Sequence, residues 1–406
     1  MINPVVNAES PPSSGDPTTA LLEKARRVAV EAARPAAASV DREARFPIEA
    51  VSALREEKLL AAAIPVQLDG LGCSLSDLSE ICTVLGKACA TTGMVFAMHQ
   101  MQVACIARHF GASTFFPDYL REAARHQWLL ASGTSEVGVG GDLRSSSAAL
   151  ELTGTDFKLH KSCTTLSYGK HADGILITAR RGPTSASGDQ VLALIRKEDY
   201  SLKQIGEWDV LGMRGTCSPP FEVTAAASVR QILPEPFRDI AIQTMIPFSH
   251  ILWSAVWLGI AADAVTTAQS HLKQTARKTP KVMPLAAPGL AGALNHFQQL
   301  SVNVRAAAEE YDRLSADPAT ASTLGTSAYA LRINNLKLAA SRMAGQICLE
   351  CLQVCGLAGY ANNSRFSLGR QLRDALSAPL MISNNRISQT NAGLLLIAGD
   401  EVLDNF

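Results

Sequence analysis

The spacing of apolar residues along this 406-residue chain changes twice, and these changes limit the folds that it can adopt. Up to Gln127 the apolar residues recur at helical spacing. Between Trp128 and Phe237, short apolar runs are separated by turn residues, which predicts β-strands. From Arg238 onward, helical spacing returns in long segments. The pattern therefore predicts an α+β protein in which helices precede and follow a β region.

The expected elements are numerous in each part of the chain. The early helices are expected at 19–44, 48–60, 75–90, 94–110 and 117–127, with Thr92-Gly93 as a break and Ser74 with Asp77 as a capping box. The strands are expected at 129–131, 148–152, 157–159, 174–179, 191–195 and 221–223. The late helices are expected at 246–274, 289–316, 327–357 and 373–402, which favours a four-helix bundle.

These changes of pattern also set the expected domain boundaries. We expect residues 1–18 to be disordered, because the segment is rich in Pro and Ser and lacks the apolar run of a signal peptide. An N-terminal helical domain at 19–127, a middle β domain at 128–237 and a C-terminal helical bundle at 238–406 follow.

The charge balance limits the kinds of partner. Lys and Arg together number 37, as do Asp and Glu, so the formal net charge is zero and no basic surface for nucleic acid is expected. The most apolar segment, Ile246–Ala268, contains His250 and Asp263. It is therefore expected to be a buried helix and not a membrane span.

The nine cysteines are scattered and odd in number, which is typical of a reducing cytoplasm, and we expect a cytoplasmic protein. Cys348, Cys351 and Cys355 share one helical face. Small apolar residues in a buried helix explain this spacing better than a metal site, so no metal is expected.

The segment Leu130–Asp173 is the best candidate for binding a ligand. A glycine-rich loop at 133–142 and a hydroxyl cluster at 164–169 lie on either side of a hairpin that we predict around 153–156, where apolar and polar residues alternate. The hairpin would bring the loop and the cluster to one region of a sheet. Polar backbone on a rigid scaffold often holds a planar cofactor, but a surface turn beside an ordinary sheet fits the same spacing.

Five motifs in this chain resemble those of the acyl-CoA dehydrogenase family of flavoproteins. They are similar to the family's Thr-Glu-Pro-Gly-x-Gly-Ser-Asp (135–142), Trp-Ile-Thr-Asn-Gly (165–169), Met-Gly-x-Arg (208–216), Gln-x-x-Gly-x-x-Gly-Tyr/Phe (353–360) and Arg-Asp-Ala (373–375) segments. The resemblance covers nearly the whole chain after the N-terminal segment. It implies a barrel-like middle domain, FAD held between that domain and the C-terminal four-helix bundle, and a homo-oligomer, either a dimer or a tetramer.

The resemblance also assigns residues to the cofactor. Ser135 and Ser167 match the positions that hydrogen-bond the flavin ring, and both keep a hydroxyl group. Thr165 stands where an indole usually covers the flavin face, which is a large loss of stacking area. The remaining matched positions are Gly141, Asn384, Gln353 and Gly356, the last two toward a neighbouring subunit's FAD, with Arg277 as the nearest arginine for the pyrophosphate.

The expected catalytic glutamate is missing. In the family, a glutamate removes a proton α to a thioester while hydride passes to flavin N5, and its place falls near Ser383 and Asn384. The alternative family position falls near His250, a weak candidate base that is more often a structural residue in such a helix. The substrate pocket is expected from Phe96, His99, Gln100, Trp253 and Met381, and for His99 the reading as a core residue is again favoured.

Three functions remain open at this point. The first is an FAD-dependent dehydrogenase that acts on the CH–CH group of an acyl thioester and passes electrons to an electron-transfer flavoprotein. The second is a monooxygenase of the same fold that receives reduced flavin from a flavin reductase and uses oxygen. The third is a degenerate flavin-binding protein without turnover. The resemblance in fold supports the first function, and the missing glutamate counts against it. Flavin can serve several reactions, so the fold alone does not choose among the three. We place the first narrowly ahead of the second.

Overall fold

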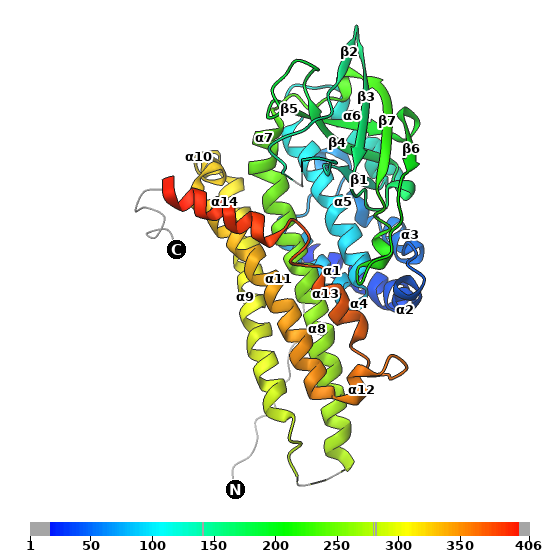
Figure 1. Cartoon of the computed structure of the whole chain (residues 1–406), viewed down its shortest axis with the longest axis vertical. Coiled ribbons are helices and arrows are strands. Elements are labelled where there is room, and N and C mark those ends of the chain that lie inside the picture. The colour runs from blue at the N-terminus through cyan, green and yellow to red at the C-terminus, as the bar shows by residue number, and fades with distance from the viewer. Residues whose placement is uncertain (1–16, 140–141, 279, 281, 398–406) are drawn as a thin grey trace.

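The computed structural model describes residues 17–139, 142–278, 280 and 282–397. The predicted order of helices, then strands, then helices is confirmed (Figure 1). The predicted disorder of the N-terminal segment concerns mainly residues 1–16, which lie outside the described residues. The N-terminal helices are α1 (Pro17–Arg27), a π-helical segment (Val28–Ala33), α2 (Arg34–Arg42), α3 (Ile48–Glu56), α4 (Leu75–Ala88), α5 (Ala90–His109) and α6 (Phe115–His126).

Helix α5 does not break at Thr92-Gly93, so this part of the prediction is wrong. The helix runs through both residues, and nearly every side chain along it is buried. A Cβ atom on Gly93 would lie only 2.9 Å from the backbone nitrogen of Gly86 in α4. Gly93 is therefore explained by the close approach of two helices and not by a turn. The predicted capping box of Ser74 and Asp77 is present at the start of α4.

The barrel-like middle part is built from two sheets. One has the order β1–β4–β5, with β1 parallel to β4, and the other is an antiparallel sheet with the order β2–β3–β7–β6. The predicted hairpin is confirmed, since Leu152 pairs with Phe157 across the turn. Strand β6 is an addition to the predicted strands, and it is short, with Tyr200 and Leu202 as its half-buried apolar residues. The strands are β1 (Leu130–Gly133), β2 (Glu151–Thr153), β3 (Asp156–Cys163), β4 (Gly174–Arg180), β5 (Gln190–Arg196), β6 (Tyr200–Gln204) and β7 (Phe221–Ser228).

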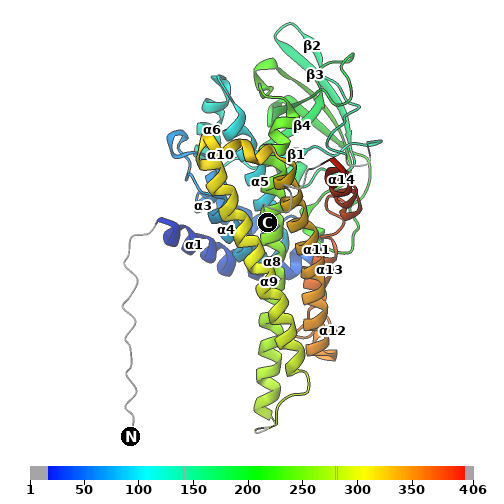
Figure 2. The same ribbon diagram turned by 90° about the vertical axis from the view of Figure 1, so that its left-hand side faces the viewer.

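Three long helices dominate the C-terminal part and run side by side along the long axis (Figures 1 and 2). The helices of this part are α7 (Phe237–Ile240), α8 (Ile246–Lys278), α9 (Ala287–Ala316), α10 (Pro318–Ala321), α11 (Ser327–Cys355), α12 (Leu357–Tyr360), α13 (Gly369–Leu376) and α14 (Asn384–Ile397). A π-helical segment, Ala241–Met245, leads into α8. Among the described residues, one helical stretch, Phe237–Lys278, is long and apolar enough to cross a membrane. However, 89% of its most apolar window is buried within the protein, as expected for a core helix.

Helices α4 and α5 pack against α8 and join the two helical parts of the molecule (Figure 2). The crossing of α4 and α8 is very close. A Cβ atom on Gly259 of α8 would lie 2.4 Å from the carbonyl oxygen of Thr83, and one on Gly86 would lie 2.7 Å from that of Val256. Both positions must therefore be glycine for the two backbones to meet in this way.

The predicted helix at 373–402 is wrong as a single element. Its sequence forms α13 and α14, and the chain between them turns away from helical geometry. Pro379 explains the interruption, because proline lacks the N–H group that a continuing helix needs. Ile382 has a φ angle of +46°, which is unusual for a β-branched residue. The segment 377–383 is therefore a shaped loop held against the helices.

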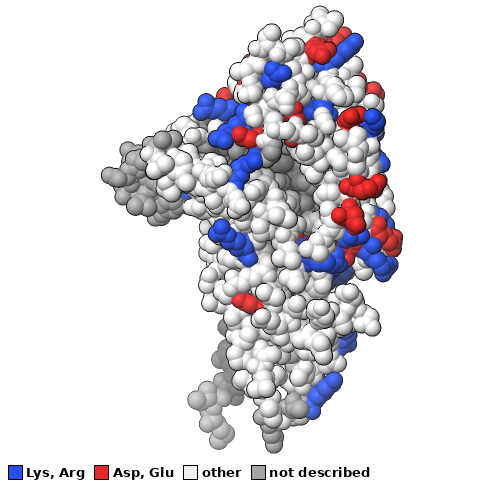
Figure 3. Space-filling view, viewed as in Figure 1, with Lys and Arg blue, Asp and Glu red and all other residues white. Residues whose placement is uncertain are grey.

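The surface agrees with the balanced composition. On the face shown in Figure 3, acidic and basic side chains are mixed, mainly along the right-hand edge, and the lower helical part is largely uncharged. This face presents no extended basic area of the kind that binds nucleic acid.

Candidate functional site

A cavity of about 720 Å³ lies where the three parts of the molecule meet. Its walls come from α5, the loops around the two sheets, the beginning of α8, and the segment from the end of α13 into α14. Methionine is prominent in these walls, and its flexible thioether suits an apolar ligand of irregular shape. The methionines are Met94, Met98, Met101, Met213, Met245 and Met381.

Six of the residues singled out from the sequence line this cavity. They are Ser135, Thr165, Ser167, Trp253, Met381 and Ser383. They come from positions up to 248 residues apart in the chain, so the fold brings the glycine-rich loop, the hydroxyl cluster and the C-terminal helices together. The indole N–H of Trp253 is buried and has no hydrogen-bond partner within the described residues, so it is available to a ligand.

The glycine-rich loop is anchored by Glu136, which is 5% exposed. Its carboxylate accepts hydrogen bonds from Ser146 Oγ at 2.6 Å, Ser147 N at 3.0 Å and Ala148 N at 2.6 Å. Lys161 Nζ lies 3.6 Å away and also donates to Thr178 O at 2.7 Å. Burial alone would raise the pKa of Glu136, but these donors and the Lys161 charge lower it below its ordinary value.

Hydroxyl groups join the glycine-rich loop to the hydroxyl cluster. Ser135 Oγ donates to Thr165 O at 2.6 Å and accepts from Thr165 N at 3.1 Å. Ser167 Oγ accepts from Ser218 Oγ at 2.8 Å, and Ser218 lies 2.8 Å from Thr216 Oγ1. The predicted meeting of the two hydroxyl-rich segments is therefore confirmed. All five of these residues line the cavity.

The Arg-Asp-Ala motif shapes the opposite wall. Arg373 Nη1 donates to Leu211 O at 2.9 Å and to Asp41 Oδ1 at 2.9 Å. Asp374 Oδ1 accepts from Met213 N at 2.7 Å. A Cβ atom on Gly212 would lie 2.0 Å from the carbonyl oxygen of Arg373, so glycine is needed for this contact. The motif thus clamps the 208–216 loop.

The structure does not bring Phe96, His99 or Gln100 to the cavity, although the sequence suggested them for the substrate pocket. All three are buried on the other faces of α5. His99 Nδ1 accepts from Leu130 N at 3.0 Å and its Nε2 lies 2.8 Å from Leu60 O, while burial lowers its pKa to about 4. Gln100 bonds the backbone of Leu59 and Ala63. These polar side chains hold backbone groups in the core.

His250 and Asn384 are also buried inside the protein. His250 is 2% exposed, and burial together with the nearby Lys337 charge lowers its pKa to about 3, so it is neutral at physiological pH. Asn384 Oδ1 accepts from Lys337 Nζ at 2.7 Å, and Asn384 Nδ2 donates to Ser341 Oγ at 3.0 Å. Neither residue lines the cavity among the described residues, which argues against a base role for His250.

The residues suggested for the distal part of FAD lie elsewhere. Arg277 is exposed in the last turn of α8, Gln353 lies in the last turn of α11, and Gly356 follows it. None of the three lines the cavity. Gly141 lies outside the described residues.

Available carboxylates are scarce in the cavity. Among the described residues that line it, Glu136 is the one acidic side chain, and its oxygens are engaged by the anchoring donors. Two cations line the same walls, Arg373 and Arg386. The sequence reasoning did not assign a role to Glu136 or Arg386. Glu136 lies within the motif matched at 135–142, and Arg386 lies beside the expected position of the glutamate.

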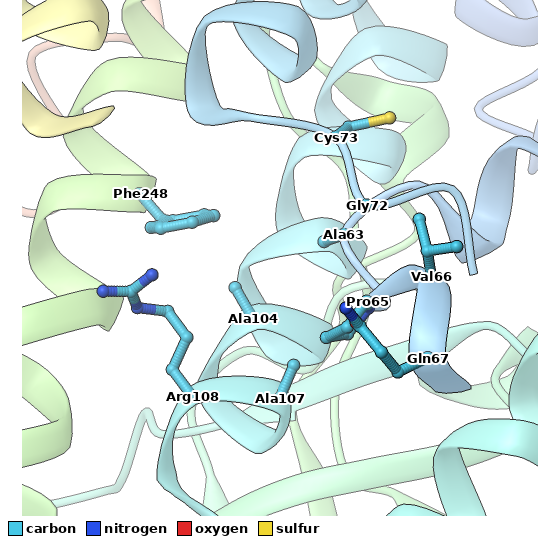
Figure 4. Close-up of a pocket in the computed structure, with 10 residues that line it drawn as sticks. All are labelled: Ala63, Pro65, Val66, Gln67, Gly72, Cys73, Ala104, Ala107, Arg108 and Phe248. Carbon is cyan, nitrogen blue, oxygen red and sulfur yellow. The ribbon is translucent and has the colours of Figure 1, made fainter. Parts of the chain in front are cut away.

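A second cleft of about 570 Å³ opens between the 63–73 loop and helices α5 and α8. Figure 4 shows Arg108 and Phe248 on one side and the loop with Cys73 on the other. Burial raises the pKa of the Cys73 thiol to about 12, so it is not a reactive thiolate. Arg108 lies 5.4 Å from the ring centre of Tyr311. This cleft holds no acid–base pair, and the larger cavity is the better candidate for chemistry.

Cys348, Cys351 and Cys355 lie in α11, are buried, and have thiol pKa values raised by burial. Within residues 17–139, 142–278 and 282–397, no group of three or more His, Cys, Asp or Glu side chains is arranged to hold a metal ion.

Comparisons with known proteins all point to one protein family. Residues 16–150 match the acyl-CoA dehydrogenase N-terminal domain and residues 240–382 match the acyl-CoA dehydrogenase C-terminal domain. The short-chain specific acyl-CoA dehydrogenase of Clostridium acetobutylicum is 25% identical over 360 residues, covering 86% of this chain and 90% of that protein. The amino sugar nitrososynthase DnmZ of Streptomyces peucetius is 24% identical over 353 residues, covering 84% of each chain.

The fold also matches that of a solved flavoprotein. The FMN-bound structure of TdsC from Paenibacillus sp. A11-2 superposes with a TM-score of 0.80 at 20% identity, covering 93% of this chain and 97% of that one. TdsC is described as a dibenzothiophene monooxygenase. With both domain matches in the expected order and four of the five motifs contributing residues to one cavity, the chain belongs to the acyl-CoA dehydrogenase family, a family of flavin-dependent oxidoreductases.

Proposed function

We propose that this protein is a flavin-dependent monooxygenase that combines reduced flavin from a partner reductase with oxygen to oxidise a small, largely apolar substrate. The observation that carries the proposal is the cavity's lack of an available carboxylate. Its one described acid, Glu136, is already bonded to Ser146, Ser147 and Ala148. Proton abstraction α to a thioester needs an ionised base within reach of the carbon, and these walls offer none.

The residues of the cavity fit a flavin. Ser135, Thr165 and Ser167 form a hydroxyl-rich edge, and the methionines give an apolar wall that excludes water. The bound flavin would supply the redox chemistry. Thr165 is exposed and much smaller than an indole, so one flavin face would be left open toward the apolar wall. Trp253 offers its unpartnered N–H group to a polar atom of the substrate.

Two similar proteins support this proposal. TdsC is a monooxygenase by its description, and DnmZ is described as an amino sugar nitrososynthase. The sequence alone placed the dehydrogenase narrowly ahead of the monooxygenase. We now place the monooxygenase first, because of these two similar proteins and because the cavity lacks a base. The cofactor expected from the sequence was FAD, whereas TdsC holds FMN, so we propose a flavin nucleotide of either kind.

Acyl-CoA dehydrogenation stays the second candidate. The observation in its favour is the similarity to a short-chain specific acyl-CoA dehydrogenase along 86% of this chain. That function would require an electron-transfer flavoprotein as partner and a base supplied by a group other than the engaged Glu136.

We also propose a homo-oligomer. Near Gln353 and Gly356, large apolar side chains are exposed at the far end of α11 and in α12, including Leu349 at 47%, Leu357 at 85% and Tyr360 at 75%. Exposed apolar side chains gathered at one end of a soluble protein are typical of an association surface. A second copy covering this end would be the means by which Gln353 and Gly356 contact a neighbouring flavin.

One experiment separates the candidates. The purified protein is first mixed with acyl-CoA thioesters under anaerobic conditions, and then supplied with reduced FMN or FAD and oxygen together with apolar sulfur and nitrogen heterocycles. Oxygen-dependent product without flavin bleaching by thioesters is expected. Bleaching by a thioester would refute the monooxygenase and support the dehydrogenase, while failure to bind any flavin would refute both.

A further inference from the structure

Arg386, the third residue of α14, has an atom that the cavity leaves without a partner. The side chain lines the cavity, and its Nη1 atom is buried with no hydrogen-bond partner among the described residues. A guanidinium group has five N–H donors and is always charged in proteins. Leaving such a donor buried and unpaired is unfavourable. The site therefore fits a ligand that supplies a hydrogen-bond acceptor to this atom.

The second cation of the cavity is not available in the same way. Arg373 donates to Asp41 and to the carbonyl oxygen of Leu211, and so holds the 208–216 loop. Arg386 makes no such clamp. Of the two cations that line the cavity in the described part of the chain, Arg386 therefore has the donors to spare.

The carboxylate that feels the charge of Arg386 is already paired with another arginine. Asp142, at the end of the glycine-rich loop, bonds Arg144 N at 3.0 Å and Arg144 Nε at 3.0 Å. Those hydrogen bonds lower the pKa of Asp142 first, and the positive charge of Arg386 lowers it further. Asp142 thus lies within the field of Arg386 but is satisfied by Arg144. The electrostatic effect on Asp142 shows that Arg386 lies near the end of the glycine-rich loop, and Val137 and Gly138 of that loop line the same cavity.

We infer that Arg386 binds the phosphate of the flavin nucleotide, either the 5′-phosphate of FMN or the pyrophosphate of FAD. The inference rests on the proposed flavin function and deepens it, because it distinguishes the phosphorylated flavins from riboflavin. A planar guanidinium matches a phosphate with paired, charge-assisted hydrogen bonds. Arg386 takes the role that the sequence suggested for Arg277, which is exposed at the end of α8 and outside this cavity.

The test compares dissociation constants of oxidised FMN, FAD and riboflavin, measured by flavin fluorescence and calorimetry without turnover. The wild-type protein is expected to bind the phosphorylated flavins more tightly than riboflavin. In Arg386→Met, the affinity for FMN and FAD should fall by about 10- to 100-fold, as for one lost charge-assisted contact. Riboflavin binding should stay within about twofold. Arg386→Lys should recover part of the loss, since an ammonium attracts phosphate without the paired geometry.

Arg121→Met is the matched control. Arg121 is half-buried on α6 and lies outside the cavity, and within the described part of the chain its ion pair is with Asp118 at i,i+3. Its removal changes the net charge equally but should leave the ratio of FMN to riboflavin affinity unchanged. Thermal unfolding of each variant checks that the fold is intact. Equal weakening of riboflavin and FMN in Arg386→Met, or no weakening of either, would overturn the assignment while leaving flavin binding standing. Failure of the wild-type protein to bind any of the three flavins would overturn the proposed function and this inference together.

Discussion

Lys337 of α11 offers a sharp test of how the cavity wall is held. The side chain is fully buried, with an exposure of 0%. Its Nζ donates to Ala378 O at 3.2 Å, to Ile382 O at 2.7 Å and to Asn384 Oδ1 at 2.7 Å. Two of these acceptors lie in the interruption between α13 and α14, and the third belongs to Asn384, the first residue of α14. Its charge has no described carboxylate partner, and the Trp257 ring centre lies 5.8 Å away.

The protonation state follows from burial and from geometry. Burial lowers the pKa of Lys337 to about 7. Three acceptors use all three donors of an ammonium group, whereas a neutral amine has only two N–H bonds. The geometry therefore fits the charged form, which these acceptors stabilise against the effect of burial.

Lys337→Met keeps the length of the side chain but removes the donors. Three hydrogen bonds to a charged group at about 1.5–3 kcal/mol each give a gross loss of roughly 5–9 kcal/mol. Relief from burying an ammonium returns several kcal/mol, which leaves a net loss on the order of 2–4 kcal/mol. For a chain of this length, that loss lowers the melting temperature by roughly 2–5 °C. The segment 377–383 should also loosen, because Ile382 is held in an unusual backbone conformation.

The assay is thermal unfolding followed by circular dichroism, with riboflavin and FMN affinity measured on the same samples. Lys337→Met should weaken both flavins by a similar factor, unlike Arg386→Met, because it disturbs the wall and not one phosphate contact. Lys158→Met, on the exposed face of β3, is the matched control and should change neither property. If Lys337→Met melts within about 1 °C of the wild type and binds flavins normally, the wall holds its shape by itself and the reasoning fails.

Three further outcomes are expected. Ser167→Val removes a hydroxyl from the flavin edge and should weaken riboflavin binding or shift the flavin absorbance, and an unchanged spectrum and occupancy would show that the ring lies elsewhere. Burial raises the pKa of Asp374 from an ordinary 3.8 to about 6. Between these pH values the folded protein binds more protons than the unfolded chain. The folded state therefore becomes more stable as the pH falls from about 6 to about 3.8. Asp374→Asn keeps the acceptor for Met213 N–H and should flatten this dependence, which melting curves at several pH values will reveal; an unaltered slope would contradict the assignment. Glu136→Gln leaves Lys161 buried without its carboxylate and should cost on the order of 3 kcal/mol in urea unfolding, and a loss below about 0.5 kcal/mol would mean that the loop is anchored by other contacts.

The sequence predicted the elements where one face of a helix or strand is clearly polar. Alternation located the hairpin, and the hydroxyl-rich segments meet as expected through Ser135 and Thr165. Helix α5 shows why the residues that line the cavity were harder to predict from the sequence. It is buried nearly all round, so periodicity could not separate the methionines that face the cavity from His99 and Gln100, which face the core.

The break before α14 was missed for a different reason. Lys337 holds two backbone oxygens of the non-helical segment, which lie 41 and 45 residues later in the chain, and no local pattern reveals such contacts. The cytoplasmic location and the domain boundaries stay predictions.

The glycine contacts between α4, α5 and α8 have a practical consequence for altering the substrate range. At Gly86, Gly93 and Gly259 the backbones meet without intervening side chains, so these helices cannot shift relative to one another without a clash. Enlarging the cavity from the α5 side would therefore meet a rigid support. Leu380, which is 79% exposed, and Met381 lie on the loop wall, which is held by hydrogen bonds from Lys337 and not by a crossing of helix backbones. Libraries of variants that aim to admit bulkier substrates are best directed at these two positions. A new side chain there displaces a loop and leaves the helical frame intact.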